Sequence, residues 1–155
     1  MRSKKPWKVG DLFQIPIAEN LYTLGQVIGL ESEMPNCPIC AFSSKKAISS
    51  KSNADCNLAE SNIIAVLFVT RDLLDSGTWQ ICRHTESAVN PAKYFDLERL
   101  RRDAFVGLKV IGSGNVTLLM QAYFGLYPWN KFHQENYLDS LLVSPSKKPS
   151  NVVLE

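Results

Sequence analysis

The chain has 155 residues, 45% of them hydrophobic and 21% charged, which suits one globular domain whose core needs no metal or disulfide to fold. Lysine and arginine number 17 against 15 acidic residues, a formal net charge of +2, so overall charge indicates neither a nucleic-acid partner nor an acidic mimic of one. The longest apolar run, residues 63–69, is far shorter than the roughly 20 residues that cross a bilayer, and we expect no membrane partner.

The first 17 residues include basic side chains of the kind that begin a secretory signal. Gly10, Asp11 and Gln14 interrupt the apolar stretch that such a signal requires. We therefore expect a soluble protein located in the cytoplasm.

Residues 11–31 predict an antiparallel hairpin, because apolar and β-branched residues flank a short polar turn. Pro16 lacks an amide donor and places its strand at a sheet edge or beside a bulge, and Gly25 indicates a sharp bend. Both residues favour a curled antiparallel sheet or a small barrel.

The following segment, residues 31–61, is rich in Ser, Lys and Asn and has no sustained hydrophobic period, which predicts a long mobile loop. Residues 63–69 then form a continuous apolar run typical of a central strand. Beyond that run, residues 71–84 predict a helical turn ending near Gly77 and then a strand. Residues 93–112 leave open a short helix followed by a strand.

The principal helix is predicted near residues 115–124, where five apolar residues repeat with the spacing of one buried helix face: Val116, Leu119, Met120, Tyr123 and Phe124. Ser113 or Asn115 can cap its start, and Gly125 stands where a helix-ending glycine belongs. The tail, residues 144–155, is expected to be frayed. The predicted fold class is α+β and mainly β, in a single domain over residues 1–155.

Four cysteines and a histidine raise the alternative of a zinc- or cysteine-dependent module. Cys37 and Cys40 have the spacing of a zinc knuckle, but the only further close pair is Cys82 with His84, and Cys56 stands alone. The first pair also lacks the strand-then-helix setting of a thioredoxin-like motif. We expect no cofactor, no metal, and free thiols in a reducing compartment.

No catalytic residue is assigned. The sequence IGSGNV, residues 111–116, lacks the third glycine of a dinucleotide fingerprint and the Lys-Ser/Thr of a P-loop, so a tight strand-to-helix turn is the simpler interpretation. Nothing in the sequence brings His133 to Cys82 as base and nucleophile. We therefore expect a protein that is not an enzyme.

Aromatic residues are concentrated between residues 122 and 142. Tyr123, Phe124 and Trp129 are predicted to belong to the core. The sequence NKFHQENYLD, residues 130–139, instead mixes rings, amides and charges, a composition typical of an ordered loop that binds another protein. The candidate binding residues on this loop are Phe132, His133, Glu135, Asn136 and Tyr137. A rival surface is the acidic start of the predicted mobile loop, at Glu31 and Glu33.

Three stretches together resemble the Immunity protein 26 family of bacterial polymorphic-toxin systems: KVGDLFQIPI with YTLGQVIG, then IGSGNVTLLMQAYFGLYPWN, and then NYLDSLL. The most specific pieces are Gly10-Asp11 with Ile15-Pro16, and Gly125-Leu126 with Pro128-Trp129 leading to Asn136-Tyr137-Leu138-Asp139. The match covers both ends and most of the chain and is weakest across residues 31–62.

The resemblance implies a mainly β, single-domain protein that binds a cognate toxin, with nucleases among the candidates, and blocks it without catalysis. No direct nucleic-acid partner is expected. A nucleic-acid-binding small barrel is the other alternative, based on the curled sheet and on the basic residues Arg99, Arg101 and Arg102.

Overall fold

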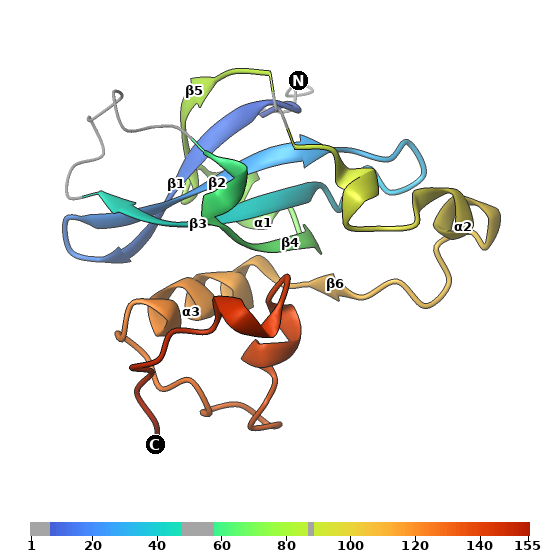
Figure 1. The fold of residues 1–155 in the computed structure, drawn as a ribbon. Helices are drawn as coiled ribbons and strands as arrows, with labels where there is room; N and C mark the ends of the chain where they lie inside the picture. Colours follow the sequence, from blue (N-terminus) through green and yellow to red (C-terminus); the bar gives the residue numbers. More distant parts are fainter. Residues whose placement is uncertain (1–6, 48–57, 87–88) are drawn as a thin grey trace.

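The computed structural model describes residues 7–47, 58–86 and 89–155 (Figure 1). Six strands form one open, mixed sheet in the order β5-β1-β2-β3-β4-β6. The strands are β1 (Asp11–Ala18), β2 (Leu21–Gly29), β3 (Ile39–Ala47), β4 (Ile63–Val69), β5 (Gln80–His84) and β6 (Val110–Ile111). Neighbouring strands are antiparallel except β4 and β6. The mainly β, α+β prediction is confirmed, but the sheet is mixed and does not close into a barrel.

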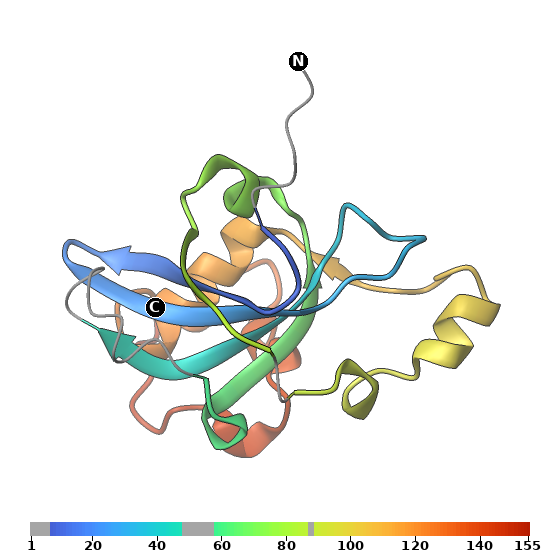
Figure 2. The same cartoon turned by 90° about the horizontal axis from the view of Figure 1, so that it is seen from above.

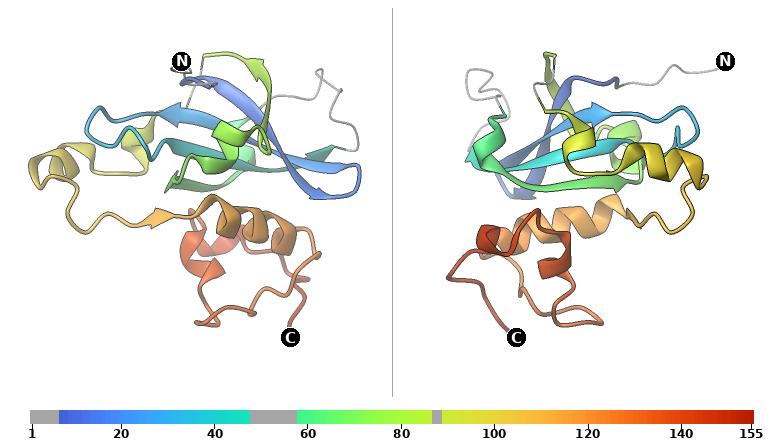
Figure 3. Two further views of the ribbon diagram at one scale, coloured as in Figure 1. Left: turned by 180° about the vertical axis from the view of Figure 1, so that it is seen from behind. Right: turned by 45° about the vertical axis from the view of Figure 1, so that its right-hand side comes forward.

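The helices flank the sheet at different places. They are α1 (Asp72–Ser76), α2 (Leu97–Arg102) and α3 (Ser113–Tyr123), with short 3₁₀ helices η2 (Glu60–Asn62), η3 (Pro91–Lys93), η4 (Leu138–Leu141) and η5 (Pro145–Lys147). Figures 1 and 3 show α3 and the chain after it as a layer against one face of the sheet. We call residues 113–155 the C-terminal layer. Figure 2 shows η3 and α2 as an arm at the side of the sheet.

The hairpin of β1 and β2 has an irregularity beside Pro16, where its sequence predicts a bulge. Strand β5 pairs with β1 only over Asp11–Gln14, so Pro16 lies beyond that pairing, and the β1–β2 register shifts after Pro16. At Gly25 a Cβ atom would lie 2.5 Å from Cζ of Phe13. Glycine is therefore required here because the Phe13 ring packs directly against the β2 backbone.

Part of the predicted mobile loop is a strand in the middle of the sheet. Residues 39–47 form β3, which pairs with β2 on one side and β4 on the other, so the loop prediction is wrong for these residues. Residues 48–57 lie outside the described part of the chain. The tail also differs from the frayed segment we expected, because its backbone returns to the layer: the amide of Trp129 donates to the carbonyl oxygen of Val153 at 2.7 Å.

The principal helix matches its prediction closely. Helix α3 begins at Ser113 rather than 115 and buries Val116, Leu119 and Met120, with Gly112 at the N-cap and no side-chain cap. At its other end Gly125 has φ of +78°. The amides of Gly125 and Leu126 donate to the carbonyls of Ala122 and Gln121, a Schellman ending that explains the glycine.

Two apolar clusters hold the layers together. The larger lies between the sheet and the C-terminal layer, where the Phe13 ring stacks on Trp79 at 5.1 Å between centroids. The smaller includes Phe68, Leu97 and Phe105 and anchors the arm to the sheet. In the described part of the chain, no helix has the length and apolar character needed to cross a membrane.

Candidate functional site

The loop at residues 130–139 starts from a buried anchor. Trp129 is 1% exposed, as predicted. Its indole Nε1 donates to Oδ1 of Asp139 at 2.8 Å, so the residue just before the loop is bonded to the residue at its end. After the loop, η4 buries Leu138 and Leu141. Both ends of the loop are therefore fixed by the core.

Three rings follow one another along this surface, and we call them the aromatic cluster: Tyr127, Phe132 and Tyr137. The Phe132 centroid lies 5.9 Å from that of Tyr127 and 5.1 Å from that of Tyr137. All three rings are partly exposed and pack against the larger core cluster. The amide Nδ2 of Asn115, from the first turn of α3, donates to the Tyr137 hydroxyl at 3.3 Å. The core and helix α3 thus hold the aromatic cluster in place, while its solvent-facing side stays accessible.

A pocket of about 310 Å³ opens beside two of these rings, and we call it the aromatic pocket. Its lining residues are Asn115, Phe132, His133, Gln134 and Tyr137. Three of the five loop candidates, Phe132, His133 and Tyr137, are therefore brought together. Glu135 and Asn136 are exposed on the same loop but do not line the pocket. Asn115 and Gln134 are lining residues that the sequence analysis missed.

The rival acidic surface lies elsewhere, at the connection between β2 and β3 beside α2. Glu31 accepts two hydrogen bonds from Arg101, at 2.6 and 2.9 Å. The hydrogen bonding to Arg101 holds the pKa of Glu31 below its ordinary value of 4.5. Glu33 is exposed. Glu31 is thus engaged in an ion pair of the arm and is not part of the aromatic pocket.

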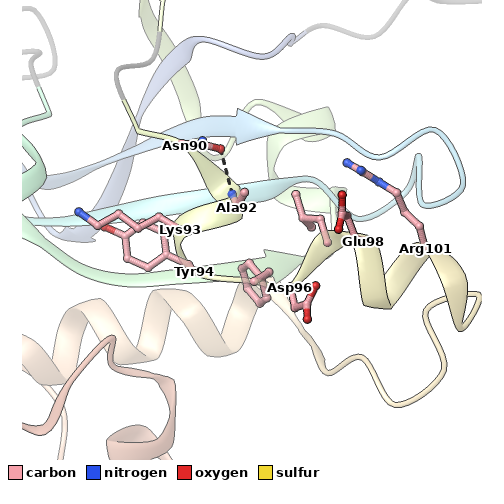
Figure 4. Close-up of a pocket in the computed structure, with 9 residues that line it drawn as sticks. Asn90, Ala92, Lys93, Tyr94, Asp96, Glu98 and Arg101 are labelled. Atoms are coloured by element: carbon pink, nitrogen blue, oxygen red, sulfur yellow. Dashed lines mark hydrogen bonds between the residues drawn. The ribbon is translucent and has the colours of Figure 1, made fainter.

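The arm carries a larger and more open cavity of about 680 Å³, which Arg101 and the polar residues of η3 and α2 line (Figure 4). Its charged side chains are largely paired with neighbours: Lys93 with Glu60, and Arg101 with Glu31. Asp96 caps α2 by accepting from the amide of Arg99. These contacts give Lys93, Arg101 and Asp96 structural roles in or beside the arm.

The basic residues of the nucleic-acid alternative do not form an unpaired patch. Arg101 is bound to Glu31, and Nε of Arg99 lies 3.9 Å from the carboxylate of Asp103. Two of the three arginines in that hypothesis therefore have their charge offset within the arm itself.

The cysteines do not assemble a site among the residues that the structure describes. Cys40 is fully buried in the core, and burial raises the pKa of its thiol strongly. Burial also raises the pKa of the half-buried Cys37. Cys82 is disulfide-bonded, so the expectation of free thiols is wrong for this residue, while Cys56 lies outside the described residues. Within the described ranges, no group of three His, Cys, Asp or Glu residues could hold a metal ion.

The remaining candidates have structural partners. Nδ1 of His84 lies 2.7 Å from the buried carboxylate of Asp11, a contact that joins β5 to β1. At the start of α3, the Ser113 hydroxyl donates to Oδ1 of Asp72 at 2.8 Å. Hydrogen bonds from Thr70 and then Ser113 hold the pKa of Asp72 below its ordinary value. A carboxylate of the chain thus occupies this helix end, which agrees with a structural turn at residues 111–116.

The fold and the site define an α+β protein with an open mixed sheet and an ordered aromatic pocket on its C-terminal layer. Comparison of the chain with protein-family models, with curated proteins and with solved structures finds no match.

Proposed function

We propose that this protein is an immunity protein that binds a cognate bacterial toxin of a polymorphic-toxin or contact-dependent inhibition system and blocks it, without catalysis of its own. The observation that carries the proposal is the aromatic cluster beside the aromatic pocket, on a loop whose two ends are anchored by Trp129 and Leu138. The resemblance of the flanking sequences to the Immunity protein 26 family supplies the class of partner.

The geometry suits protein recognition for two physical reasons. Aromatic side chains such as tyrosine and phenylalanine are enriched at the centre of protein interfaces, and tyrosine is among the residues that contribute most binding energy there. A loop that is already ordered also loses little conformational freedom on binding, so more of the contact energy appears as affinity. Phe132 and Tyr137 are the residues we assign to the centre of the contact, with His133, Glu135 and Asn136 at its rim.

Cytoplasmic action is part of the proposal, and the disulfide of Cys82 stands against it, because disulfides persist mainly in oxidising compartments. Trapping of free thiols in intact bacteria, followed by mass spectrometry, decides the point. A cytoplasmic protein should show Cys82 as a thiol. Complete oxidation of Cys82 in the cell would show that the protein resides in an oxidising compartment and would contradict cytoplasmic action.

Co-expression with the toxin encoded beside this protein tests the function. The toxin should stop growth alone and be tolerated with the wild-type chain, and the purified pair should form a complex. Replacing Phe132 and Tyr137 together with alanine should weaken binding by at least about 2 kcal/mol, roughly 30-fold, if both are hot spots. Val106→Ala is the matched control, because Val106 is 78% exposed and does not line the aromatic pocket.

Circular dichroism must first show that the double variant is folded. Unchanged growth protection and affinity in that folded variant would remove the loop from the interface. Glu33→Lys then tests the rival surface: a slower, more salt-sensitive association would place the partner beside the connection of β2 and β3. Absence of any protection or complex with the wild-type protein would overturn the function itself.

A further inference from the structure

Several aromatic rings of the C-terminal layer lie under a lysine ammonium group. The Nζ atoms of Lys46, Lys131 and Lys148 lie 5.3, 5.9 and 5.7 Å from the ring centroids of Phe124, Tyr127 and Trp129. These distances are within the range over which a cation is attracted to the face of a ring. The layer therefore already binds positive charge on its aromatic surfaces.

Two of these lysines are also neutralised by carboxylates. Nζ of Lys131 lies 3.4 Å from Glu155, and Nζ of Lys148 lies 3.2 Å from Asp139. Each cation is therefore held between a ring and an acid. At two places on this surface, one ammonium group thus contacts both a ring and a carboxylate.

The aromatic pocket has two ring faces without a cation, and a carboxylate lies on the same loop outside its lining. No lysine or arginine of the described residues lies over the Phe132 or Tyr137 ring, and both rings face the pocket. Glu135, two residues before Tyr137, is exposed and belongs to no ion pair within the described part of the chain. The Tyr137 hydroxyl oxygen accepts a hydrogen bond from Asn115 of α3, so this polar group already has a partner within the protein.

We propose that the aromatic pocket receives a basic side chain of the partner, specifically an arginine, whose guanidinium group stacks on Phe132 and Tyr137, with Glu135 of the same loop as its counter-charge. This inference rests on the proposed function of the loop and names the chemistry of its partner. Arginine is preferred over lysine because its planar group stacks on rings and is less strongly hydrated. A volume of about 310 Å³ suits one long side chain and lies at the low end of the range for ligand pockets.

The overall charge of the chain gives no general attraction to a basic side chain. The formal net charge is +2, so attraction must come from a local group. Two ring faces in the pocket and one carboxylate on the same loop can attract a cation without an acidic surface. Binding should therefore depend only weakly on salt, because few charges take part.

A titration without the toxin tests the pocket directly. The probes are N-acetyl-arginine methylamide and its neutral isostere, N-acetyl-citrulline methylamide, and the ring resonances of Phe132 and Tyr137 are followed by NMR. Saturable shifts at millimolar concentration with the arginine probe, and none with citrulline, are the expected result. An equal response to both probes, or no response, overturns the inference.

Two variants distinguish the contribution of the aromatic ring to probe binding from that of apolar size alone. Phe132→Leu keeps an apolar side chain but removes the ring, and should weaken the arginine probe at least about threefold. Val106→Ala, whose side chain does not line the pocket, should retain binding. A Phe132→Leu protein that binds the probe like the wild type overturns the inference.

The toxin assay then distinguishes this inference from the proposed function. If the double alanine variant loses protection but the wild-type pocket does not respond to the arginine probe, the loop binds the toxin by other chemistry and only this inference fails. If the double alanine variant still protects, the partner does not use the pocket and this inference fails whatever the probe does. Absence of protection by the wild-type protein overturns both.

Discussion

Replacing Trp129 with alanine should remove the anchor that fixes the start of the loop at residues 130–139. The side chain is 1% exposed and belongs to the larger core cluster. Truncation of a buried tryptophan typically costs roughly 3 to 5 kcal/mol, because apolar contact is lost and a cavity remains. The indole also donates to Asp139 at 2.8 Å, but that half-buried carboxylate keeps Lys148 at 3.2 Å and water access.

The loss of the indole hydrogen bond should therefore add little, and we expect a total near 4 kcal/mol. For a chain of 155 residues this corresponds to a fall in melting temperature of roughly 8 to 16 °C. Trp129→Phe should cost only about 1 to 2 kcal/mol, since a ring still fills much of the site. The difference between the two variants measures the contribution of packing.

Thermal and urea denaturation followed by circular dichroism give both quantities. Leu126→Ala is the control, because Leu126 is 47% exposed and should change stability by less than about 0.5 kcal/mol. A melting temperature that Trp129→Ala lowers by less than about 2 °C would refute the packing argument. Equal losses in the alanine and phenylalanine variants would show that the hydrogen bond, and not the buried ring, carries the stability.

Three other substitutions or treatments test the scaffold. Gly25→Ala should destabilise the protein by about 1 to 3 kcal/mol in urea unfolding, because the new Cβ would lie 2.5 Å from the fully buried Phe13 ring; Gly114→Ala, where nothing lies within 4 Å, should not. The Cys40 thiol should resist iodoacetamide in the folded protein and react in urea, since burial blocks access and raises its pKa. Glu31 has a lowered pKa in the folded state, so its ion pair should stabilise the protein fully above pH 4.5 and lose that effect as pH falls below this value. Glu31→Gln should therefore reduce the loss of unfolding free energy below pH 4.5. An unchanged loss would contradict a stabilising role for the ion pair.

Much of the fold could be predicted because its elements carry local signals. The α3 stripe, the Gly125 ending and the apolar run of β4 are each readable over a few residues. Strand β3 could not be predicted, since Ser43 is fully buried and the strand continues into Lys45. The polarity of Ser43 is compensated by contacts made only in the folded state: its carbonyl accepts from the Thr23 hydroxyl at 3.1 Å and its Oγ accepts from the Lys45 amide at 3.0 Å.

The loop residues of the candidate site could be predicted from the sequence, but the contribution of helix α3 could not. The mixture of rings and amides in residues 130–139 identified Phe132, His133 and Tyr137. Asn115 contributes through a contact made across 22 positions of sequence, which only the packing of α3 against the loop creates. A single sequence has no local pattern that indicates such a contact. Glu31 and Glu33 were candidates only because they are acidic residues at the start of a predicted loop.

The connection between β5 and β6 joins the two opposite edges of the sheet. Five strand spacings of about 4.8 Å separate these edges, a distance of roughly 24 Å that about seven or eight extended residues would cross. Residues 85–109 are therefore much longer than the crossing requires, and η3 and α2 take up part of the surplus. Phe105 is buried beneath the arm, whereas Val106 beside it is 78% exposed. The exposed turn at Val106 is thus a place where inserted residues should disturb the sheet little, which makes it suitable for a reporter domain that leaves the aromatic pocket untouched.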